Sequence, residues 1–420
     1  MHMTFFSPSR RPLARSAIYL VSLSLFCSMP SACASSKSKQ NKAAANVAAE
    51  QGEYADFNEW QDVRAFTDMM VEKHGYPRDD LQAIFKNARH ISSAIQLIKP
   101  APVGQAKNWQ AYRARFVEPI RIAAGLSFWN AHADALARAE KEYGVPAEII
   151  VGILGIETLY GKNTGNFRVL DVLTTLAFDY PDTPTRAARM DYFRSELENA
   201  LLFSRESSID PFSLRGSYAG AIGWPQFMPA SIRKYAVDYD GDGKIDLRNS
   251  PDDAIGSVAN FLVQHGWRSG EPTVFPTTVE TPLEDGKIGW PSYIGQGLEA
   301  KFTLAELKAA GVHPTVEPPQ DMPFGLVDLQ NGTEPTEYWL GAANFFAVTQ
   351  YNRSYFYAMS VIDLGRAVES LRSARWRGPA SLSNPGQDNG ACLVHSGSHE
   401  KITHAIAQVQ SLCQAIQPRL

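Results

Sequence analysis

The sequence predicts a mainly α-helical (α+β) fold with a small β-containing insert. Apolar residues recur every three or four positions over residues 57–100, which is the spacing of one face of a helix. Thr, Val and Pro dominate residues 272–279, and a later apolar run meets the turn Asn331-Gly332, so this region predicts strands and a hairpin. Helical periodicity returns over residues 339–348 and 355–371. The strands therefore interrupt a chain that is otherwise helical.

Turn and capping residues divide the helical regions. His74-Gly75 ends the first long predicted helix. A later helix is expected over residues 129–143, and Gly144-Val145-Pro146 then breaks the chain, with the proline in the first turn of the next helix. Thr303 and Glu306 have the spacing of a capping box, which predicts a short helix inside the β-containing insert.

Composition limits the class of protein. The 420 residues are enough for two or three domains. Hydrophobic residues make up 44% and charged residues 20%, so the chain can build a large core and is too apolar for a disordered protein. The net charge of −4 supplies no basic field. We therefore expect a globular protein that does not bind nucleic acid.

The first 33 residues predict an export signal, because three arginines precede the apolar stretch 17–26 and small residues follow at 31–34. Two cleavage sites compete. Ordinary cleavage follows Ala34, whereas Ser31-Ala32-Cys33 resembles a lipobox in which Cys33 becomes the lipidated first residue. A frayed N-terminus without a role is the remaining alternative.

The location follows from the residues after this signal. Residues 34–55 begin with a Ser/Lys/Ala-rich stretch that looks like a tether, which favours the lipid anchor. Ala34 is not the aspartate that signals inner-membrane retention, so we expect a lipoprotein of the outer membrane facing the periplasm, with a soluble periplasmic protein as the alternative. In that oxidising compartment Cys392 and Cys413 are expected to form a disulfide; two unpaired thiols are the alternative.

Glu157 is the strongest candidate for catalysis. It shares a helix face with Ile150, Ile153 and Leu154, at spacings of seven, four and three residues. A carboxylate on such a face is paired, neutralised by a raised pKa, or lines a cleft. Glu157 also precedes Gly161 by about one turn, near the negative end of the helix dipole, which raises the pKa further. A general acid for neutral pH arises in this way; a buried structural glutamate is the alternative.

The segment 216–229 is a candidate ligand-binding loop. Three of its first eight residues are glycine, and Pro-Gln-Phe-Met-Pro follows. In such a loop, backbone and aromatic groups can approach a ligand closely. A tight structural turn is the alternative.

The segment that begins at Asp238 is similar to a calcium-binding EF-hand loop. Gly243 stands at position 6, but Asn249 replaces the bidentate glutamate of position 12, and Asp252 or Asp253 is expected to supply that ligand. A structural Ca²⁺ is therefore expected, and an acidic surface turn without an ion is the alternative. The carboxylates at positions 1, 3, 5 and 9 are Asp238, Asp240, Asp242 and Asp246.

The three elements occur in an order that resembles the membrane-bound lytic murein transglycosylase B family, over residues 57–365. Residues 145–158 resemble the segment with the family's catalytic glutamate. Residues 217–229 resemble its substrate-cleft loop, and residues 238–253 resemble its EF-hand-like metal loop. Tyr351-Asn352-Arg353-Ser354 is similar to its Tyr-Asn-x-Ser motif.

This resemblance implies roles for individual residues. Glu157 is the implied catalytic residue, and no cofactor is implied for catalysis. Two positions depart from the family pattern, since Ala188 stands for an arginine and Phe261 for a tyrosine. The implied substrate contacts are Ser217, Gln226, Tyr112, Arg189, Tyr192, Tyr351, Asn352 and Tyr357. The implied metal ligands are Asp238, Asp240, Asp242, Lys244 and Asp253.

The resemblance also implies a lysozyme-like helical core with an EF-hand-like loop, a flanking helical domain and a small β-containing domain. The expected division is an export signal (1–33), a tether (34–55), an N-terminal helical domain (56–130), a lysozyme-like catalytic core with the metal loop (131–267), a small β-containing domain (268–340), a cleft-lining return segment (341–376), and a linker with a C-terminal helix of unknown role (377–420).

The implied reaction cuts the β-1,4 bond between N-acetylmuramic acid and N-acetylglucosamine in peptidoglycan. Ordinary glycosidases need two carboxylates, whereas the recognisable cleft motifs supply only Glu157. One residue suffices if it protonates the glycosidic oxygen and then takes a proton from the C6 hydroxyl of the sugar, which leaves a 1,6-anhydro end. Ser217 and Gln226 would orient the acetamido group. The expected partners are glycan strands, with membrane contact only through the lipid, and the protein is expected to be a monomer.

Two rival functions remain at this point. A hydrolytic muramidase requires a second carboxylate near Glu157, for which Asp171 and Asp179 are the candidates. A non-catalytic, calcium-bearing wall-binding protein would keep Glu157 as a structural acid. The reducing end of the product separates the first rival from a transglycosylase, and any turnover eliminates the second.

Overall fold

A computed structural model describes residues 52–100, 104, 106–280 and 289–376, and within them the mainly α-helical fold is confirmed. The predicted export signal with Cys33, most of the tether, and the tail with Cys392 and Cys413 lie outside the described residues. None of the described helices combines the length and apolarity that crossing a membrane requires.

The N-terminal part is built from short helices. The helix α2 ends at Gly75, whose φ of 57° is the left-handed conformation that glycine tolerates, as His74-Gly75 predicts. The elements are β1 (Glu53–Tyr54), the 3₁₀ helix η1 (Phe57–Glu59), α2 (Gln61–His74), α3 (Arg78–Asn87), β2 (Arg89–His90), α4 (Ser92–Leu97) and α5 (Trp109–Arg113). The strands β1 and β2 pair antiparallel.

The central part places an apolar helix, α8, among other helices. All residues from Ile149 to Ile156 are buried, and α8 contacts α6, α7 and α12. The single helix expected over residues 129–143 is wrong, because His132 leaves the helical conformation (φ −122°, ψ 31°) and separates α6 from α7. The elements are α6 (Pro119–Ala131), α7 (Ala133–Tyr143), α8 (Ala147–Thr158), β3 (Phe167–Arg168), α9 (Val169–Phe178), α10 (Arg186–Glu206), β4 (Arg215–Gly216), α11 (Pro229–Tyr235) and α12 (Pro251–Gln264).

The β-containing insert is a four-stranded antiparallel sheet of order β6-β5-β8-β7. Gly332 (φ 66°) turns the predicted hairpin between β7 and β8, and the capping box predicted at Thr303 and Glu306 is present. The helix predicted over residues 339–348 is wrong at its start, because residues 339–341 pair with both neighbouring strands. The elements are β5 (Val274–Val279), η2 (Trp290–Tyr293), α13 (Leu304–Ala309), β6 (Val312–Pro314), β7 (Gly325–Asn331) and β8 (Glu334–Gly341).

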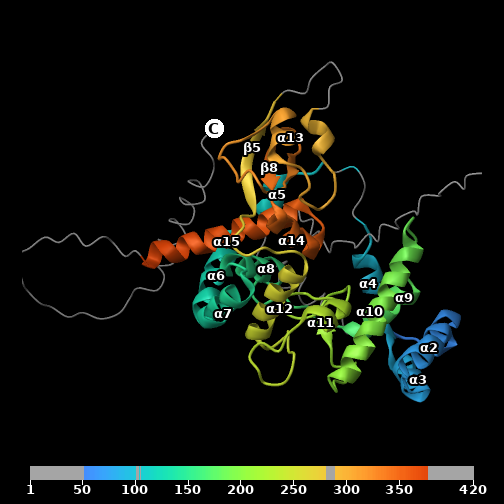
Figure 1. The fold of residues 1–420 in the computed structure, drawn as a ribbon. Helices are drawn as coiled ribbons and strands as arrows, with labels where there is room; N and C mark the ends of the chain where they lie inside the picture. Colours follow the sequence, from blue (N-terminus) through green and yellow to red (C-terminus); the bar gives the residue numbers. More distant parts are fainter. Residues whose placement is uncertain (1–51, 101–103, 105, 281–288, 377–420) are drawn as a thin grey trace, which may run out of the picture.

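The return segment joins the two parts. It comprises α14 (Ala343–Asn352) and α15 (Tyr355–Trp376), and α15 runs between the sheet and the helices α6, α7 and α8 (Figure 1). A Cβ at Gly152 would lie 2.3 Å from the carbonyl oxygen of Val361, and one at Gly365 would lie 2.2 Å from that of Glu148. These two glycines therefore allow α8 and α15 to pack backbone against backbone.

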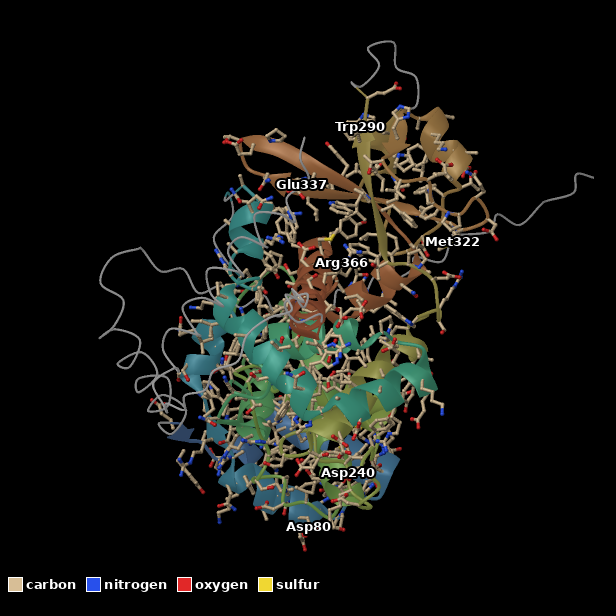
Figure 2. All side chains as sticks on the ribbon, turned by 90° about the vertical axis from the view of Figure 1, so that its left-hand side faces the viewer. Asp80, Asp240, Trp290, Met322, Glu337 and Arg366 are labelled. Carbon is tan, nitrogen blue, oxygen red and sulfur yellow. The ribbon has the colours of Figure 1, made fainter. Side chains whose placement is uncertain are left out.

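The sheet and the acidic loop lie at opposite ends of the molecule. Trp290 and Met322 mark the sheet end and Asp240 the other end, with Arg366 of α15 between them (Figure 2). A small apolar cluster supports the sheet, whereas one large cluster runs from Phe57 to Val368 through the helical parts. The central helices thus form one continuous core around α8.

Candidate active site

Glu157 lies in the last turn of α8. Its neighbours Ile156 and Thr158 are buried, whereas Glu157 is partly exposed because it faces a cleft. Burial raises the pKa of Glu157 to about 7, although a hydrogen bond from Tyr357 opposes the shift. A carboxyl with this pKa exists in both protonation states near neutral pH, which is the property of a general acid and base.

Three tyrosines surround this carboxyl. Tyr357 donates a hydrogen bond from its hydroxyl to Oε1 of Glu157 at 2.6 Å. The pKa of Tyr351 is raised well above its usual value by burial and by the negative charge of Glu157. Burial, together with the charge of Glu157, raises the pKa of Tyr112 to about 12. All three phenols therefore remain protonated donors at neutral pH.

The cleft around Glu157 encloses about 230 Å³. Phe261, the position that departs from the family pattern, is one of its walls and stacks on His265 with ring centroids 3.9 Å apart. The site residues expected from the sequence that line the cleft are Glu157, Arg189, Tyr192, Gln226, Tyr351 and Asn352. The structure thus brings together residues from α8, α10, α14 and the loop before α11.

The loop at residues 216–229 is fixed to the end of α8. The Thr158 hydroxyl donates to the carbonyl oxygen of Trp224 at 2.9 Å, and a Cβ at Gly161 would lie 2.3 Å from the Trp224 ring. Gln226 is held in a left-handed conformation (φ 51°), and its Nε2 donates to the carbonyl oxygen of Gly223 at 2.8 Å. Its amide oxygen is thereby left to accept a hydrogen bond in the cleft.

Unlike Gln226 of the same loop, Ser217 does not line the cleft directly. It is half-buried and is not among the residues that line the cleft. Its hydroxyl oxygen accepts hydrogen bonds from the backbone N–H groups of Ala219 (3.4 Å) and Ala221 (3.1 Å), both of which do line the cleft. The hydroxyl proton remains available for donation.

The wall formed by α10 carries a second carboxyl. Arg189 is buried over the rings of Tyr192 and Phe193, and its Nε and Nη1 atoms have no hydrogen-bond partner among the described residues. Glu196 accepts a hydrogen bond from the backbone N–H of Ala230 at 2.9 Å, and burial raises its pKa to about 7. The sequence signal that was missed is the spacing of Arg189, Tyr192 and Glu196 by three and four residues on one helix face.

Asp171 and Asp179 do not line this cleft. Asp171 is buried and accepts hydrogen bonds from the guanidinium of Arg168 at 2.6 and 2.7 Å and from the backbone N–H of Arg89 at 3.0 Å. Asp179 lies 2.9 Å from Nε2 of His90. Both carboxylates therefore serve contacts between α9 and the N-terminal part.

The acidic loop before α12 brings three carboxylates together. The oxygens of Asp238, Asp240 and Asp253 lie within 4.8 Å of one another. Asp253 is buried and accepts hydrogen bonds from the backbone N–H groups of Tyr239 and Asp246, each at 2.7 Å. Carboxylate oxygens are the hard donors that Ca²⁺ prefers.

The other expected metal residues lie near this cluster. The carboxylate of Asp242 accepts from the backbone N–H of Lys244 at 2.8 Å, and its own N–H donates to Asp238 at 3.1 Å. Asp252 lies 3.8 Å from His132 instead of joining the cluster. Of the two aspartates expected to complete the site, Asp253 is therefore the one placed to do so.

The chain is similar to several known proteins in sequence and in structure. The sequence profile of the family described as "Transglycosylase SLT domain" matches residues 58–366. Membrane-bound lytic murein transglycosylase B of Escherichia coli K12 is 41% identical over 326 residues, which are 76% of this chain and 85% of that protein. The structure of soluble lytic transglycosylase SltB1 from Pseudomonas aeruginosa is 43% identical, with 74% of this chain and 99% of that chain covered and a TM-score of 0.67.

A third relative has a structure that contains calcium. The structure of the Escherichia coli lytic transglycosylase Slt35 in complex with calcium is 40% identical, with 77% of this chain and 97% of that chain covered and a TM-score of 0.67. The family profile covers well over half of the chain, from before α2 into α15, and the structural match covers 77% of the chain. The chain therefore belongs to the transglycosylase SLT domain family.

Proposed function

We propose that this protein is a lytic transglycosylase that cleaves the β-1,4 bond between N-acetylmuramic acid and N-acetylglucosamine in peptidoglycan and leaves a 1,6-anhydromuramic end. One observation carries the proposal: the Glu157 carboxyl, with a pKa of about 7, faces a cleft and accepts a hydrogen bond from Tyr357. The relatives that are named lytic transglycosylases support the class of reaction.

In the proposed reaction Glu157 acts twice. Protonated Glu157 gives its proton to the glycosidic oxygen, and the bond from that oxygen to C1 of muramic acid breaks. The C6 hydroxyl of the same sugar then bonds to C1 and returns its proton to Glu157. No water is consumed, and Glu157 ends in its starting state. The Tyr357 hydroxyl stabilises the carboxylate that exists between the two steps.

The remaining site residues would hold the sugar. Gln226 offers an amide oxygen in the cleft, and the Ser217 hydroxyl can donate its proton, so this pair suits an acetamido group. Asn352 has a buried Oδ1 without a hydrogen-bond partner among the described residues, which suits an N–H of the substrate. Tyr112, Arg189, Tyr192 and Tyr351 complete the proposed contacts.

A hydrolytic muramidase is the second candidate, because Glu196 is another carboxyl in the same cleft. Its position argues against that role. Glu196 is only 5% exposed, and it is engaged with Tyr192 and with the backbone N–H of Ala230. A group held in this way is poorly placed to activate a water molecule across the sugar ring.

Mass spectrometry of digested murein separates these functions. Transglycosylase products are lighter by one water than the products of hydrolysis, and their muramic ends resist borohydride reduction. Products with free reducing ends would establish a muramidase instead. Binding to murein without any turnover would establish a wall-binding protein.

Calcium binding and location form a further part of the proposal. Asp238, Asp240 and Asp253 would hold a structural Ca²⁺, with Asp242 and the backbone carbonyl of Lys244 as additional donors. Cys33 would carry a lipid that anchors a monomeric enzyme to the outer membrane on its periplasmic side, and Cys392 and Cys413 would form a disulfide. Cell fractionation of wild type and Cys33→Ala tests the anchor, since the variant is expected in the soluble periplasmic fraction.

A further inference from the structure

Arg353 is a charged cleft residue that the proposed reaction does not use. It lies among the residues that line the cleft, directly after Asn352. Its side chain is exposed, and it has no hydrogen-bond or ion-pair partner within the described part of the chain. A guanidinium at the mouth of a ligand cleft without a protein partner is available to a ligand.

The backbone conformation of Arg353 indicates that its side chain has a function. Arg353 ends α14 in a left-handed conformation (φ 31°, ψ 37°), where glycine or asparagine is the usual residue. The turn into α15 is secured by the next residue, because the Ser354 hydroxyl oxygen accepts the backbone N–H of Tyr357 at 3.3 Å. The turn itself therefore gives no reason for an arginine at a strained position.

The charges around the cleft favour an anionic ligand. Arg189, buried on α10, adds a second guanidinium whose Nε and Nη1 atoms have no hydrogen-bond partner among the described residues. The two carboxyls of the cleft, Glu157 and Glu196, are both driven toward the neutral form by burial. The cleft therefore presents two cations against two acids that are only partly ionised near neutral pH.

We propose that Arg353 is a specificity residue that binds a carboxylate of the glycan substrate at the mouth of the cleft. This inference rests on the proposed function, because it takes the substrate to be peptidoglycan. Two sources offer this chemistry: the lactyl carboxylate of muramic acid in peptide-free strands, and the carboxylates of the stem peptide in peptide-bearing strands. A planar guanidinium matches either carboxylate with two parallel hydrogen bonds.

The test compares four substrates at low ionic strength: peptide-bearing and peptide-free glycan strands, each with its carboxylates intact or converted to neutral methylamides. Wild type is expected to cleave the carboxylate form with about fivefold higher kcat/KM than the methylamide form, mainly through KM. In Arg353→Gln this ratio is expected to fall to about one, and Arg353→Lys is expected to retain part of it. Salt near 0.5 M should reduce the wild-type ratio, because the contact is exposed.

Matched variants keep the result interpretable. Arg366→Gln removes an exposed guanidinium from α15 (Figure 2). Arg366 is not among the residues that line the cleft, so this variant is expected to keep the wild-type ratio. Arg353→Asn suits the left-handed turn, so its Tm is expected to be at least that of wild type. Its ratio of kcat/KM between carboxylate and methylamide substrates is still expected to fall to about one.

The outcomes distinguish the lactyl carboxylate from the stem-peptide carboxylates, and they distinguish failure of the role of Arg353 from failure of the proposed function. A ratio that depends on Arg353 in peptide-free strands assigns the lactyl carboxylate, and one found only in peptide-bearing strands assigns the stem. Equal ratios in wild type and Arg353→Gln on both kinds of strand overturn the role of Arg353. If wild type releases no anhydro product from any strand, the proposed function fails instead.

Discussion

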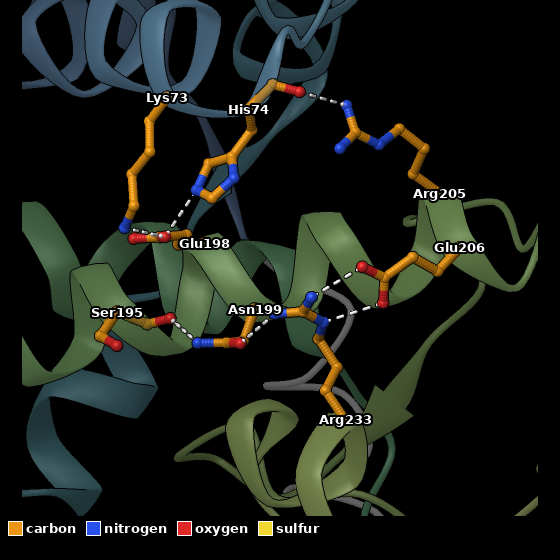
Figure 3. Close-up of polar contacts among 8 residues, drawn as sticks. All are labelled: Lys73, His74, Ser195, Glu198, Asn199, Arg205, Glu206 and Arg233. Carbon is orange, nitrogen blue, oxygen red and sulfur yellow. Dashed lines mark hydrogen bonds and ion pairs between the residues drawn. The ribbon is translucent and has the colours of Figure 1, made fainter.

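Two faces of α10 carry glutamates only two residues apart, and their pKa values move in opposite directions. On the cleft side, burial raises the pKa of Glu196 to about 7. On the opposite side, burial has the same tendency at Glu198, but hydrogen bonds from Lys73 and His74 lower its pKa overall. Figure 3 shows this outer face, where Lys73 Nζ and His74 Nε2 lie 2.8 and 2.7 Å from the same Glu198 oxygen.

The difference lies in how each face distributes its cations. The outer face pairs its charges within the protein, as in the contacts of Arg233 with Glu206 at 2.7 Å and with Asn199 at 2.6 Å (Figure 3). On the cleft face, Arg189, Glu157 and Glu196 have no ion-pair partner among the described residues, and no cation lowers the pKa of either glutamate. Unpaired buried polar groups are unfavourable for folding, so their presence marks the cleft as a ligand site.

The largest expected effect is at Glu157. Glu157→Gln keeps the shape of the side chain but cannot transfer a proton, so glycan cleavage is expected to fall by roughly 10³-fold while sugar binding persists. Glu148→Gln is the matched control on the same helix, because Glu148 also has a burial-raised pKa but lies outside the cleft. Residual activity of Glu157→Gln within about tenfold of wild type, a barrier change of only ~1.4 kcal/mol, would contradict the assignment.

The pH dependence of cleavage tests the cleft side of the comparison. Glu157 must start protonated, and its pKa is raised to about 7, so kcat is expected to be level below that pH and to fall tenfold for each unit above it. Initial rates between pH 5 and 9 measure this profile. A rate that rises through pH 7 would require the ionised carboxylate and would reverse the order of the proton transfers.

Calcium removal tests a third arrangement, in which carboxylates cluster with one another. Ca²⁺ at about 100 times its dissociation constant is expected to stabilise the fold by about 2.7 kcal/mol, and EDTA should remove this increment. Asp238→Asn is expected to abolish the response of Tm to calcium, whereas Asp191→Asn, which changes an exposed acid of α10, should retain it. A Tm that is the same in EDTA and in added calcium would exclude the site.

Sequence reasoning found the parts of the site that are local in the chain. The apolar run of α8, the glycine-rich loop and the acidic loop each have a recognisable pattern, and the family resemblance added Tyr351 and Tyr357. Contacts over long distances had no such signal: Tyr357 meets Glu157 across 200 positions of sequence. Glu196 was missed because an ionisable residue in a long polar helix normally faces solvent.

Two boundaries of secondary-structure elements were predicted wrongly, because they too depend on contacts between distant parts of the chain. Residues 339–341 look helical in isolation, yet their pairing with β5 and β7 makes them the end of a strand. His132 breaks a helix whose residues are all compatible with continuation. Tertiary contacts determine the secondary structure at these positions, and such contacts cannot be derived from the local periodicity of the sequence.

A smaller effect is expected on stability, with opposite signs on the two faces of α10. The pKa of Glu196 is higher in the folded protein than the usual 4.5. Its favourable contribution to the free energy of unfolding is therefore fully present below pH 4.5 and is lost as the pH rises toward 7. At pH 7.5 Glu196→Gln is therefore expected to be more stable than wild type, by on the order of 1–2 kcal/mol.

Glu198→Gln is the matched variant with the opposite sign. The lowered pKa of Glu198 means that its contribution is present above pH 4.5 and is lost as the pH falls through the folded value. At pH 7.5 this variant should be less stable than wild type, and at pH 3 the two should converge. Urea unfolding at both pH values measures this, and a shift of equal sign for Glu196→Gln and Glu198→Gln at pH 7.5 would refute the comparison.

The smallest effect is expected at the edge of the outer face. Arg233 joins α11 to α10 through two hydrogen bonds to the Glu206 carboxylate, at 2.7 and 2.9 Å, but both side chains are substantially exposed. Exposed ion pairs contribute about 0.2–1 kcal/mol, so Arg233→Met is expected to lower the free energy of unfolding by less than about 1 kcal/mol. Salt near 0.5 M should halve this loss, because screening acts on the exposed pair. A double-mutant cycle with Glu206→Gln isolates the pair, and a coupling above about 2 kcal/mol would mean that this face is as desolvated as the cleft.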